Sequence, residues 1–439
     1  MVRGKLANAF IFFDPIWPIV IDIRPCREEV CPAEILIIMI TQRKDDIMGH
    51  TLDFLDRTGL STLKWEYEQE KYNDPSLLCF GTADMDFGCP QPILDSITEV
   101  VQKRHLGYPY IRGSYYEAIE SWLARTTGWH IDARTCTATN VGVYTAVWTI
   151  LDALTQPGDE VIIQTPVHFC FTQILRDNGR VPVVNPLKEE NQAYRMDWEH
   201  LESLFTSKTK IFWLCNPHNP IGRAWTVEEL HRLGEICLRN HVTILSDDIY
   251  CGLVFPGVSY TPIASLSPQL SQNTITCYSP SKSYNTTGIK FSYVVSENPE
   301  IIQKYNVSLA KLDLTYGINI FGLAITEAAY NHCDPWLQNL MQYIQGNYRF
   351  LCDFVRDRLP GASVAKADAT YFAWIDMRCL GIPTDQLSTI FQERAHIIIN
   401  SGTSLGQGGE GHMRLNLACS QKTLQEGLLR LEKIYQLLR

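Results

Sequence analysis

Short apolar runs alternate with amphipathic stretches along the middle of the chain. The runs are rich in Val, Ile and Thr and end in polar or turn-forming residues, which is typical of buried strands. The seven predicted strands are residues 135–139, 160–166, 180–187, 209–217, 242–248, 273–279 and 290–295. Strands that alternate with helices predict an α/β fold, in which helices cover both faces of a central, mostly parallel, seven-stranded sheet.

The stretches between these runs repeat apolar residues at helical spacing and carry end signals. Leu230, Leu233 and Cys237 share one face of a predicted helix that begins at Thr226. Glu229 stands three residues after Thr226, which is the pattern of a capping box. The sequence therefore predicts regular helices between the strands of the sheet.

After Pro299 the pattern becomes mainly helical and ends in a second strand set. Long amphipathic stretches precede two short apolar runs, 370–376 and 413–418, and a last helix at 423–438. This order predicts a smaller α+β domain after the large one. The predicted divisions are an N-terminal extension outside the core, a segment joining the small domain, a large domain and a small C-terminal domain, at residues 1–47, 48–92, 93–335 and 336–439.

Residues 1–47 do not fit the pattern of the rest. Their apolar stretches are short or are interrupted by residues such as Asp14 and Pro18, so neither reaches the ~20 apolar residues of a membrane helix. Asp14 also breaks the apolar core that a signal peptide needs. Three interpretations stay open: an extension outside the core, a true start at Met48, and a targeting segment.

The composition of the chain argues against two functional classes, nucleic-acid-binding proteins and metal-binding proteins. The net charge is −10 and no basic block occurs, which argues against nucleic-acid binding through a basic surface. The 14 cysteines are scattered, with no C-x-x-C pair and no Cys/His cluster at zinc spacing, so no metal site is expected. Unpaired cysteines inside apolar runs favour a reducing, cytoplasmic compartment.

Polar side chains collect where the predicted strands end. In open α/β sheets, ligands bind outside the carboxyl ends of the strands. The residues at these positions are Asn140, Asn219, Asp247, Ser279 and Lys282. Lys282 stands on a Ser/Pro/Gly-rich turn between two predicted strands, where a solvated surface lysine is the alternative interpretation.

Two charged residues interrupt apolar strands. Asp247 ends one such run, and a carboxylate there must be paired or face a cavity. A helix N-cap is the alternative for Asp247, although its neighbour Asp248 suits such a structural role better. Arg414 stands among Met413, Leu415 and other apolar residues, where it needs an anionic partner.

Four motifs together resemble one enzyme superfamily. They are CNPHNPIG at 215–222, SDDIY at 246–250, SPSK at 279–282 and HMRLNLA at 412–418. Their order resembles that of pyridoxal-phosphate (PLP) enzymes of fold type I, the aspartate-aminotransferase-like fold of the class I and II aminotransferase superfamily. The resemblance implies an enzyme with pyridoxal 5'-phosphate as cofactor.

The resemblance assigns roles around the cofactor ring. Lys282 is expected to join the cofactor covalently and later to move a proton at the substrate α-carbon. Asp247 is expected to pair with the pyridine nitrogen. Asn219 and Tyr250 are expected to hydrogen-bond the phenolate oxygen, although turn chemistry for Asn219 and simple packing for Tyr250 are the alternatives. Arg414 is expected to hold the substrate α-carboxylate.

The same resemblance assigns the phosphate contacts. Ser279 and the backbone amides of Gly142 and Val143, at a helix N-terminus, are expected to bind the phosphate. Lys290 replaces the usual arginine and can bind as a point charge; a solvated lysine is its alternative. Tyr108 resembles a tyrosine that reaches the phosphate of the other subunit, which implies a homodimer with shared active sites.

Further motifs narrow the branch. ADMDF at 83–87, STLKWE at 61–66 and CNPHNPIGRAWT at 215–226 resemble the MalY/PatB-type branch of cystathionine β-lyases and cysteine-S-conjugate β-lyases. Three features depart from that branch. His168 stands where an aromatic residue stacks on the cofactor, and its imidazole can stack or carry a proton. SDDIY at 246–250 is closer to general aminotransferases, and Tyr144 replaces a small apolar residue beside the cofactor. Together these changes suggest a specialised substrate such as a bulky S-conjugate.

The branch implies a carbon–sulfur lyase that converts a cysteine S-conjugate to a thiol, pyruvate and ammonia by α,β-elimination. Alternatives on the same fold are an aminotransferase and a decarboxylating or oxidative relative. An alternative of another class is a catalytically inactive binding or regulatory protein, against which the joint presence of Lys282, Asp247 and Arg414 argues. The expected partner is a small amino-acid substrate, with no nucleic acid and no membrane.

Overall fold

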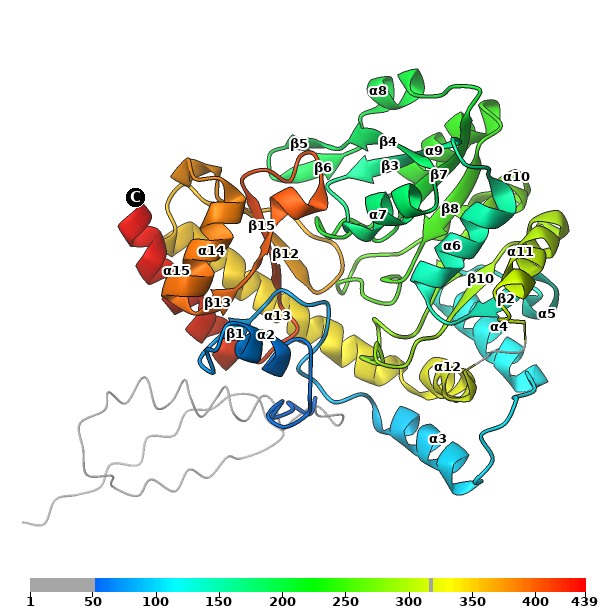
Figure 1. Cartoon of the computed structure of the whole chain (residues 1–439), viewed down its shortest axis with the longest axis horizontal. Coiled ribbons are helices and arrows are strands. Elements are labelled where there is room, and N and C mark those ends of the chain that lie inside the picture. The colour runs from blue at the N-terminus through cyan, green and yellow to red at the C-terminus, as the bar shows by residue number, and fades with distance from the viewer. Residues whose placement is uncertain (1–51, 316–318) are drawn as a thin grey trace, which may run out of the picture. The chain divides into compact units, whose positions relative to one another are not determined.

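A computed structural model of the protein describes residues 52–315 and 319–439 (Figure 1). The expectations for the extension at 1–47 lie outside these residues. Within the described part, no helix is long and apolar enough to span a bilayer. The 12 cysteines of this part are free thiols, as the scattered spacing predicted, and most of them are buried.

The larger sheet has the seven strands that the sequence predicted. Their order is β2, β10, β9, β8, β7, β3, β4. All neighbours pair in parallel except β10, which is antiparallel to both β2 and β9. The strands are β2 (Thr137–Asn140), β3 (Glu160–Thr165), β4 (Val181–Pro186), β7 (Thr209–Cys215), β8 (Thr243–Asp247), β9 (Thr274–Tyr278) and β10 (Ser292–Val295).

Successive residues of each strand enter different cores, because side chains of a strand alternate between the two faces of a sheet. Ile163, Trp213 and Leu245 pack with helices of one face. Ile162 and Phe212 pack with helices of the other face. The helices of the first core are α6 (Val143–Leu154), α7 (Cys170–Asp177) and α11 (Pro299–Lys311), and those of the second are α8 (Trp198–Ser203) and α9 (Val227–Arg239).

The predicted helix signals are confirmed. The Thr226 hydroxyl accepts the Glu229 N–H, and the Glu229 carboxylate accepts the Thr226 N–H, so the capping box of α9 is complete. Beside the large sheet, α12 packs on α3 and α4. These three helices and the short helices nearby are α3 (Gln91–Gln102), α4 (Gly113–Thr127), α5 (Ala133–Cys136), α10 (Pro268–Gln272) and α12 (Ile320–His332).

The C-terminal part has its own antiparallel sheet, of which Figure 1 labels β12 and β15. The strand order is β11, β12, β15, β14. Its strands are β11 (Ser363–Val364), β12 (Phe372–Asp376), β14 (Asn400–Ser401) and β15 (His412–Asn416). Its helices are α13 (Asp334–Arg358), α14 (Thr384–Ala395) and α15 (Gln421–Leu438). The predicted boundary at 335/336 falls near the start of α13, and the domain division stays a prediction.

Two small pairings were not predicted from the sequence. The strand β1 (Leu78–Cys79) pairs in parallel with β13 (Ile397–Ile398), which fixes the segment after α2 (Glu66–Lys71) to the C-terminal part. A hairpin joins β5 (Lys188–Glu190) and β6 (Ala193–Arg195). Strands of two or three residues carry too little periodicity for a sequence pattern to reveal them.

Candidate active site

Lys282 lies in the loop between β9 and β10, as the turn signals predicted. Its Nζ donates a hydrogen bond to the carbonyl oxygen of Ala83 at 3.0 Å. Part of the side chain is exposed, but the amino group lies deep enough that burial lowers its pKa to about 8. The charge of Asp84 opposes that shift, and those of Lys290 and Arg414 add to it. A lysine of this kind is partly neutral near pH 7–8, as a base or nucleophile must be.

Asp247 ends β8 and is 7% exposed. Its carboxylate accepts the Ile249 N–H at 3.4 Å, and no cation of the described residues lies within ion-pair distance of it. Burial raises its pKa to about 7, and the charge of Lys282 acts against that shift. A buried carboxylate without a cationic partner is costly, so a protonated ring nitrogen is a partner that this position suits.

The neighbouring Asp248 has the structural role that the sequence suggested. It is fully buried and accepts hydrogen bonds from the hydroxyls of Ser246 and Tyr260. Burial raises its pKa to about 8. The two adjacent carboxylates therefore differ: one is enclosed by hydroxyl donors, and the other is left with a single long backbone contact.

Arg414 lies on β15 and joins three segments. Its guanidinium donates to Asn219 Oδ1 at 3.1 Å, to Asn400 Oδ1 at 2.8 Å and to the Gly81 carbonyl oxygen at 2.9 Å. Its Nε is buried and has no acceptor among the described residues. All of these acceptors are neutral, so the charge of Arg414 is free to bind a carboxylate.

The same network includes Asn219 and Tyr250, the pair expected to hydrogen-bond the phenolate oxygen of the cofactor. Asn219 Nδ2 lies 3.4 Å from the Tyr250 hydroxyl, and both residues are buried. The Arg414 guanidinium also stacks over Phe372, with its carbon 4.1 Å from the ring centroid. The fold thus brings Asn219, Tyr250 and Arg414 together from the segments that follow β7 and β8 and from β15. Their spacing in the sequence does not predict these contacts.

His168 follows β3 and lies beside Phe169, with the ring centroids 4.5 Å apart. Burial lowers its pKa to about 3, and the positive charges of Arg414 and Lys282 lower it further. Of the two possibilities left open by the sequence, the structure therefore favours a neutral imidazole that stacks over one that carries a proton near neutral pH.

The expected phosphate contacts are only partly assembled. Gly142 caps α6 and Val143 begins it, so their backbone N–H groups lie at a helix N-terminus that has free donors. The loop between β9 and β10, residues 279–291, is here called the lysine loop. The Ser279 hydroxyl is within hydrogen-bond distance of the Phe291 carbonyl and of Ser281, so it already has partners inside this loop. Lys290 is exposed, and its charge reaches Lys282.

Two predicted residues are not joined to this group in the protomer. Tyr108 is 86% exposed in the loop between α3 and α4, where its ring is available to another chain. Tyr144 is 43% exposed in the first turn of α6. Asn140, another strand-end residue, has a structural role: it donates to the Tyr305 hydroxyl and accepts the Val141 N–H.

Three contributors were missed from the sequence. Ala83 acts through its backbone carbonyl, which no side-chain pattern reveals. Asn400 orients Arg414 from a two-residue strand and offered no signal. Asp84 belongs to the ADMDF motif, which marked the branch but suggested no role for the residue.

These residues fit the cofactor that the resemblance implies. A PLP molecule presents an aldehyde, a phenolate oxygen, a ring nitrogen and a phosphate. The site offers a lysine with a lowered pKa, an amide beside a phenol, a buried carboxylate without a cation and a helix N-terminus. Lys282, Asp247, Asn219 and Tyr250 would hold the ring, and α6 would face the phosphate.

Comparison with known proteins bears on the family, the fold and the cofactor. The family model "Aminotransferase class I and II" matches residues 77–431. A relative, the cystathionine beta-lyase PatB of Bacillus subtilis, is 36% identical over 378 residues, which are 86% of this chain and 97% of that protein.

Solved structures give the same picture. A PLP-bound putative aminotransferase from Clostridium difficile superimposes with a TM-score of 0.84 at 34% identity, over 87% of this chain and 98% of its own. Cystalysin from Treponema denticola, which contains pyridoxal 5'-phosphate, gives a TM-score of 0.85 at 29% identity, over 88% and 99%. The predicted fold type is thereby confirmed.

Proposed function

This chain belongs to the class I and II aminotransferase family, and we propose that within it the chain is a carbon–sulfur β-lyase. It is an enzyme whose cofactor is pyridoxal 5'-phosphate. The proposed reaction cleaves a cysteine S-conjugate to a thiol, pyruvate and ammonia. Likeness to PatB, named a cystathionine beta-lyase, and to cystalysin supports this branch of the family.

One observation bears most directly on the substrate. The buried guanidinium of Arg414 is held by three neutral acceptors and interacts electrostatically with Lys282. This arrangement suits a substrate with one carboxylate next to its reacting carbon. The side chain beyond the β-carbon then needs no second charged anchor, as for a cysteine with an apolar group on sulfur.

The residues divide the work of elimination. When bound, the cofactor supplies an electron sink for the negative charge that develops at the substrate α-carbon. Asp247 holds positive charge at the ring nitrogen, and Arg414 fixes the carboxylate and so the orientation of the α-carbon. Lys282, as a neutral amine, takes the α-proton and becomes an ammonium.

The electron pair left at the α-carbon then forms a double bond to the β-carbon, and the carbon–sulfur bond breaks. The sulfur leaves with the bonding electrons as a thiolate and becomes a thiol on protonation. The remaining unsaturated amino acid is hydrolysed to pyruvate and ammonia. His168, kept neutral by burial and by the charges of Arg414 and Lys282, would pack against the ring without adding a charge.

The substrate side of the site supports a bulky S-conjugate. Phe169 is 52% exposed beside His168, and Tyr144 is 43% exposed at the start of α6. The exposed ring of Phe169 beside His168 suits an apolar sulfur substituent, as in a specialised pathway, and Tyr144 is expected to add a second ring. We further propose a cytoplasmic homodimer, in which the exposed Tyr108 of one subunit serves the site of the other.

The test is to incubate the purified enzyme with a panel of cysteine S-conjugates and to measure pyruvate and free thiol without any added keto acid. We expect both products in equal amounts, with the fastest turnover for large apolar substituents. Strict dependence on an added α-keto acid would contradict the lyase and favour the aminotransferase alternative, which the likeness to the C. difficile protein keeps in view.

The inactive alternative has its own test. A catalytically inactive binding or regulatory protein would not join the cofactor covalently to Lys282. A visible absorption band that borohydride removes, with the label found on Lys282, excludes this alternative. Absence of that band in protein saturated with pyridoxal phosphate would support it.

A further inference from the structure

Two motifs that marked the branch have no role in the chemistry described so far, and the structure pairs them. They are ADMDF at 83–87 and STLKWE at 61–66. Residues 82–87, here called the strap, run beside the lysine loop. The Ala83 carbonyl of the strap accepts the hydrogen bond from Lys282 Nζ at 3.0 Å.

Asn285 of the lysine loop forms further hydrogen bonds with the strap. Its Nδ2 donates to the carbonyls of Met85 at 3.2 Å and Phe87 at 2.7 Å, and its Oδ1 accepts the Met85 N–H at 3.2 Å. From the other side, Asn416 donates to the carbonyls of Thr82 and Asp84, both at 2.7 Å. The backbone of the strap is therefore bonded to both the lysine loop and the end of β15.

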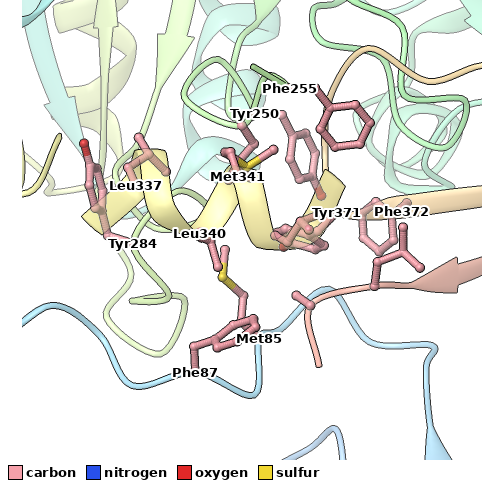
Figure 2. Close-up of a cluster of buried hydrophobic side chains, with 14 of the residues drawn as sticks. Met85, Phe87, Tyr250, Phe255, Tyr284, Leu337, Leu340, Met341, Tyr371 and Phe372 are labelled. Atoms are coloured by element: carbon pink, nitrogen blue, oxygen red, sulfur yellow. The ribbon is translucent and has the colours of Figure 1, made fainter. Parts of the chain in front are cut away.

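The side chains of the strap alternate between two environments. Met85 and Phe87 are 1% and 0% exposed and pack in the core with Leu340 of α13, toward which Figure 2 shows them pointing. Asp84 and Asp86 instead contact basic residues that precede α2. One face of the strap is thus anchored by apolar contacts and the other by charge.

The charged anchor is a buried ion pair. Lys64 is 0% exposed, and its Nζ lies 3.0 Å from Asp86 Oδ2 and 3.3 Å from the Asp84 carbonyl. Trp65 Nε1 donates to the other oxygen of Asp86 at 2.8 Å, and Arg57 binds the Asp84 carboxylate at 2.6 Å. A fully buried lysine contributes little net stability, because removing it from water costs much of what the pair gains. Lys64 contacts the Asp84 carbonyl, one residue from the Ala83 carbonyl that accepts from Lys282, and this placement points to another use.

We propose that Lys64 and Asp86 are positioning residues, whose ion pair fixes the strap so that the Ala83 carbonyl orients the free amine of Lys282 for removal of the α-proton. A neutral amine has two N–H donors and one lone pair. Donation of one N–H to Ala83 limits where the lone pair can point. After the proton transfer, the same carbonyl accepts from the ammonium, and the Asp84 carboxylate stabilises its charge.

This inference rests on the part of the proposed function that makes Lys282 the base. Removal of the α-proton is common to elimination and transamination, so the inference holds for either outcome. It also predicts a property of the cofactor-free chain, because the contacts of the strap involve protein groups alone.

The first test compares Lys64→Met and Asp86→Asn with wild type in the holoenzyme. We expect kcat to fall about 10- to 100-fold with little change in KM, because a misplaced base slows the chemical step more than binding. The isotope effect on kcat with α-deuterated substrate should rise. Glu432→Gln is the matched control: Glu432 is 7% exposed, as Asp86 is 6% exposed, and its pair with Arg358 spans 2.9 Å.

The second test needs no cofactor. In the apoenzyme, backbone amides of 82–87 should exchange hydrogen faster in both single variants than in wild type, and not in Glu432→Gln. The double variant Lys64→Met/Asp86→Asn buries neither charge alone. We expect it to regain thermal stability while kcat stays low and the isotope effect stays raised.

Two results would overturn the proposal. One is recovery of kcat together with stability in the double variant, which would make the pair merely structural. The other is an isotope effect and exchange at 82–87 that equal wild type in all variants. If wild type transaminates instead of eliminating, the isotope effect is measured on that reaction, so a failure of the proposed lyase activity remains distinguishable.

Discussion

Asp247 is the site residue whose substitution has opposite consequences for stability and for catalysis. In the cofactor-free chain it is a buried carboxylate with one backbone donor at 3.4 Å. In the loaded enzyme it is expected to face the ring nitrogen. Replacement by asparagine keeps the shape and removes the charge, so the two states of the enzyme should respond in opposite directions.

The magnitude follows from its pKa. Burial raises the pKa of Asp247 from 3.8 to about 7. A raised pKa means that the contribution of Asp247 to the stability of the folded apoenzyme is fully present below about pH 4 and is lost as the pH rises to about 7, because the folded state must then ionise a buried group. The difference of about 3 between the two values corresponds to at most about 4 kcal/mol. Asp247→Asn should therefore stabilise the apoenzyme at pH 8 and leave it nearly unchanged at pH 4.

In the holoenzyme the same variant should lose activity. An asparagine cannot hold a positive charge at the ring nitrogen, and the loss of one such electrostatic contact costs ~3 kcal/mol of barrier, or ~100-fold in kcat. Thermal unfolding of the apoenzyme between pH 4 and 8, with kcat of the holoenzyme, measures both effects. Asp248→Asn is the comparison for kcat, because the Asp248 carboxylate is bonded to two hydroxyls of the protein, so kcat should fall less than in Asp247→Asn.

A rate within about threefold of wild type would refute the assignment of Asp247, since the electron sink would not depend on it. An apoenzyme of Asp247→Asn that is less stable than wild type at pH 8 would refute the electrostatic reasoning separately. The kcat measurement therefore tests the role of Asp247 at the ring nitrogen, and the stability measurement tests the effect of burial on its carboxylate.

Three further predictions follow from the same site. Lys282→Ala should keep its fold, because the side chain is partly exposed in a loop, but lose the visible band that borohydride removes; a normal band contradicts the assignment. Arg414→Lys keeps the charge but loses the fork that reaches Asn219, Asn400 and Gly81, so KM should rise about 10- to 100-fold in initial-rate assays, and an unchanged KM rejects carboxylate binding. Tyr108→Phe should weaken cofactor affinity measured by titration of the apoenzyme, while sedimentation shows a dimer; a fully active monomer rules out a shared site.

Sequence patterns were informative where the chain is periodic. The runs at 160–166 and 242–248 became β3 and β8, because alternating apolar residues serve two cores and leave little choice of face. The end of each strand then located Asp247 and the start of the lysine loop. Local chemistry was equally readable at Thr226, where both hydrogen bonds of the capping box form.

Patterns failed where a contact depends on the whole fold. The Ala83 carbonyl and Lys282 are 199 residues apart, and Asn219 and Arg414 are 195 apart. No local signal specifies such partners. The sequence also could not show how far a side chain is buried. It left both protonation states open for His168, whereas in the structure burial and the charges of Arg414 and Lys282 favour the neutral imidazole. The phosphate contact expected of Ser279 stays a prediction, and its hydroxyl has partners within its own loop.

The charges of the site show what its missing partner must supply. Within the part of the chain that the structure describes, Asp247, Lys282 and Arg414 have no ion-pair partner within contact distance, and burial shifts the pKa of each away from its charged form. Lys64 and Asp86, by contrast, are paired with each other. Unpaired charges at the end of β8, on β15 and in the loop after β9 are therefore a cost to folding that a ligand offsets. PLP and an amino acid would together present the matching groups: a cationic ring nitrogen, a carbonyl that a lysine can attack and a carboxylate.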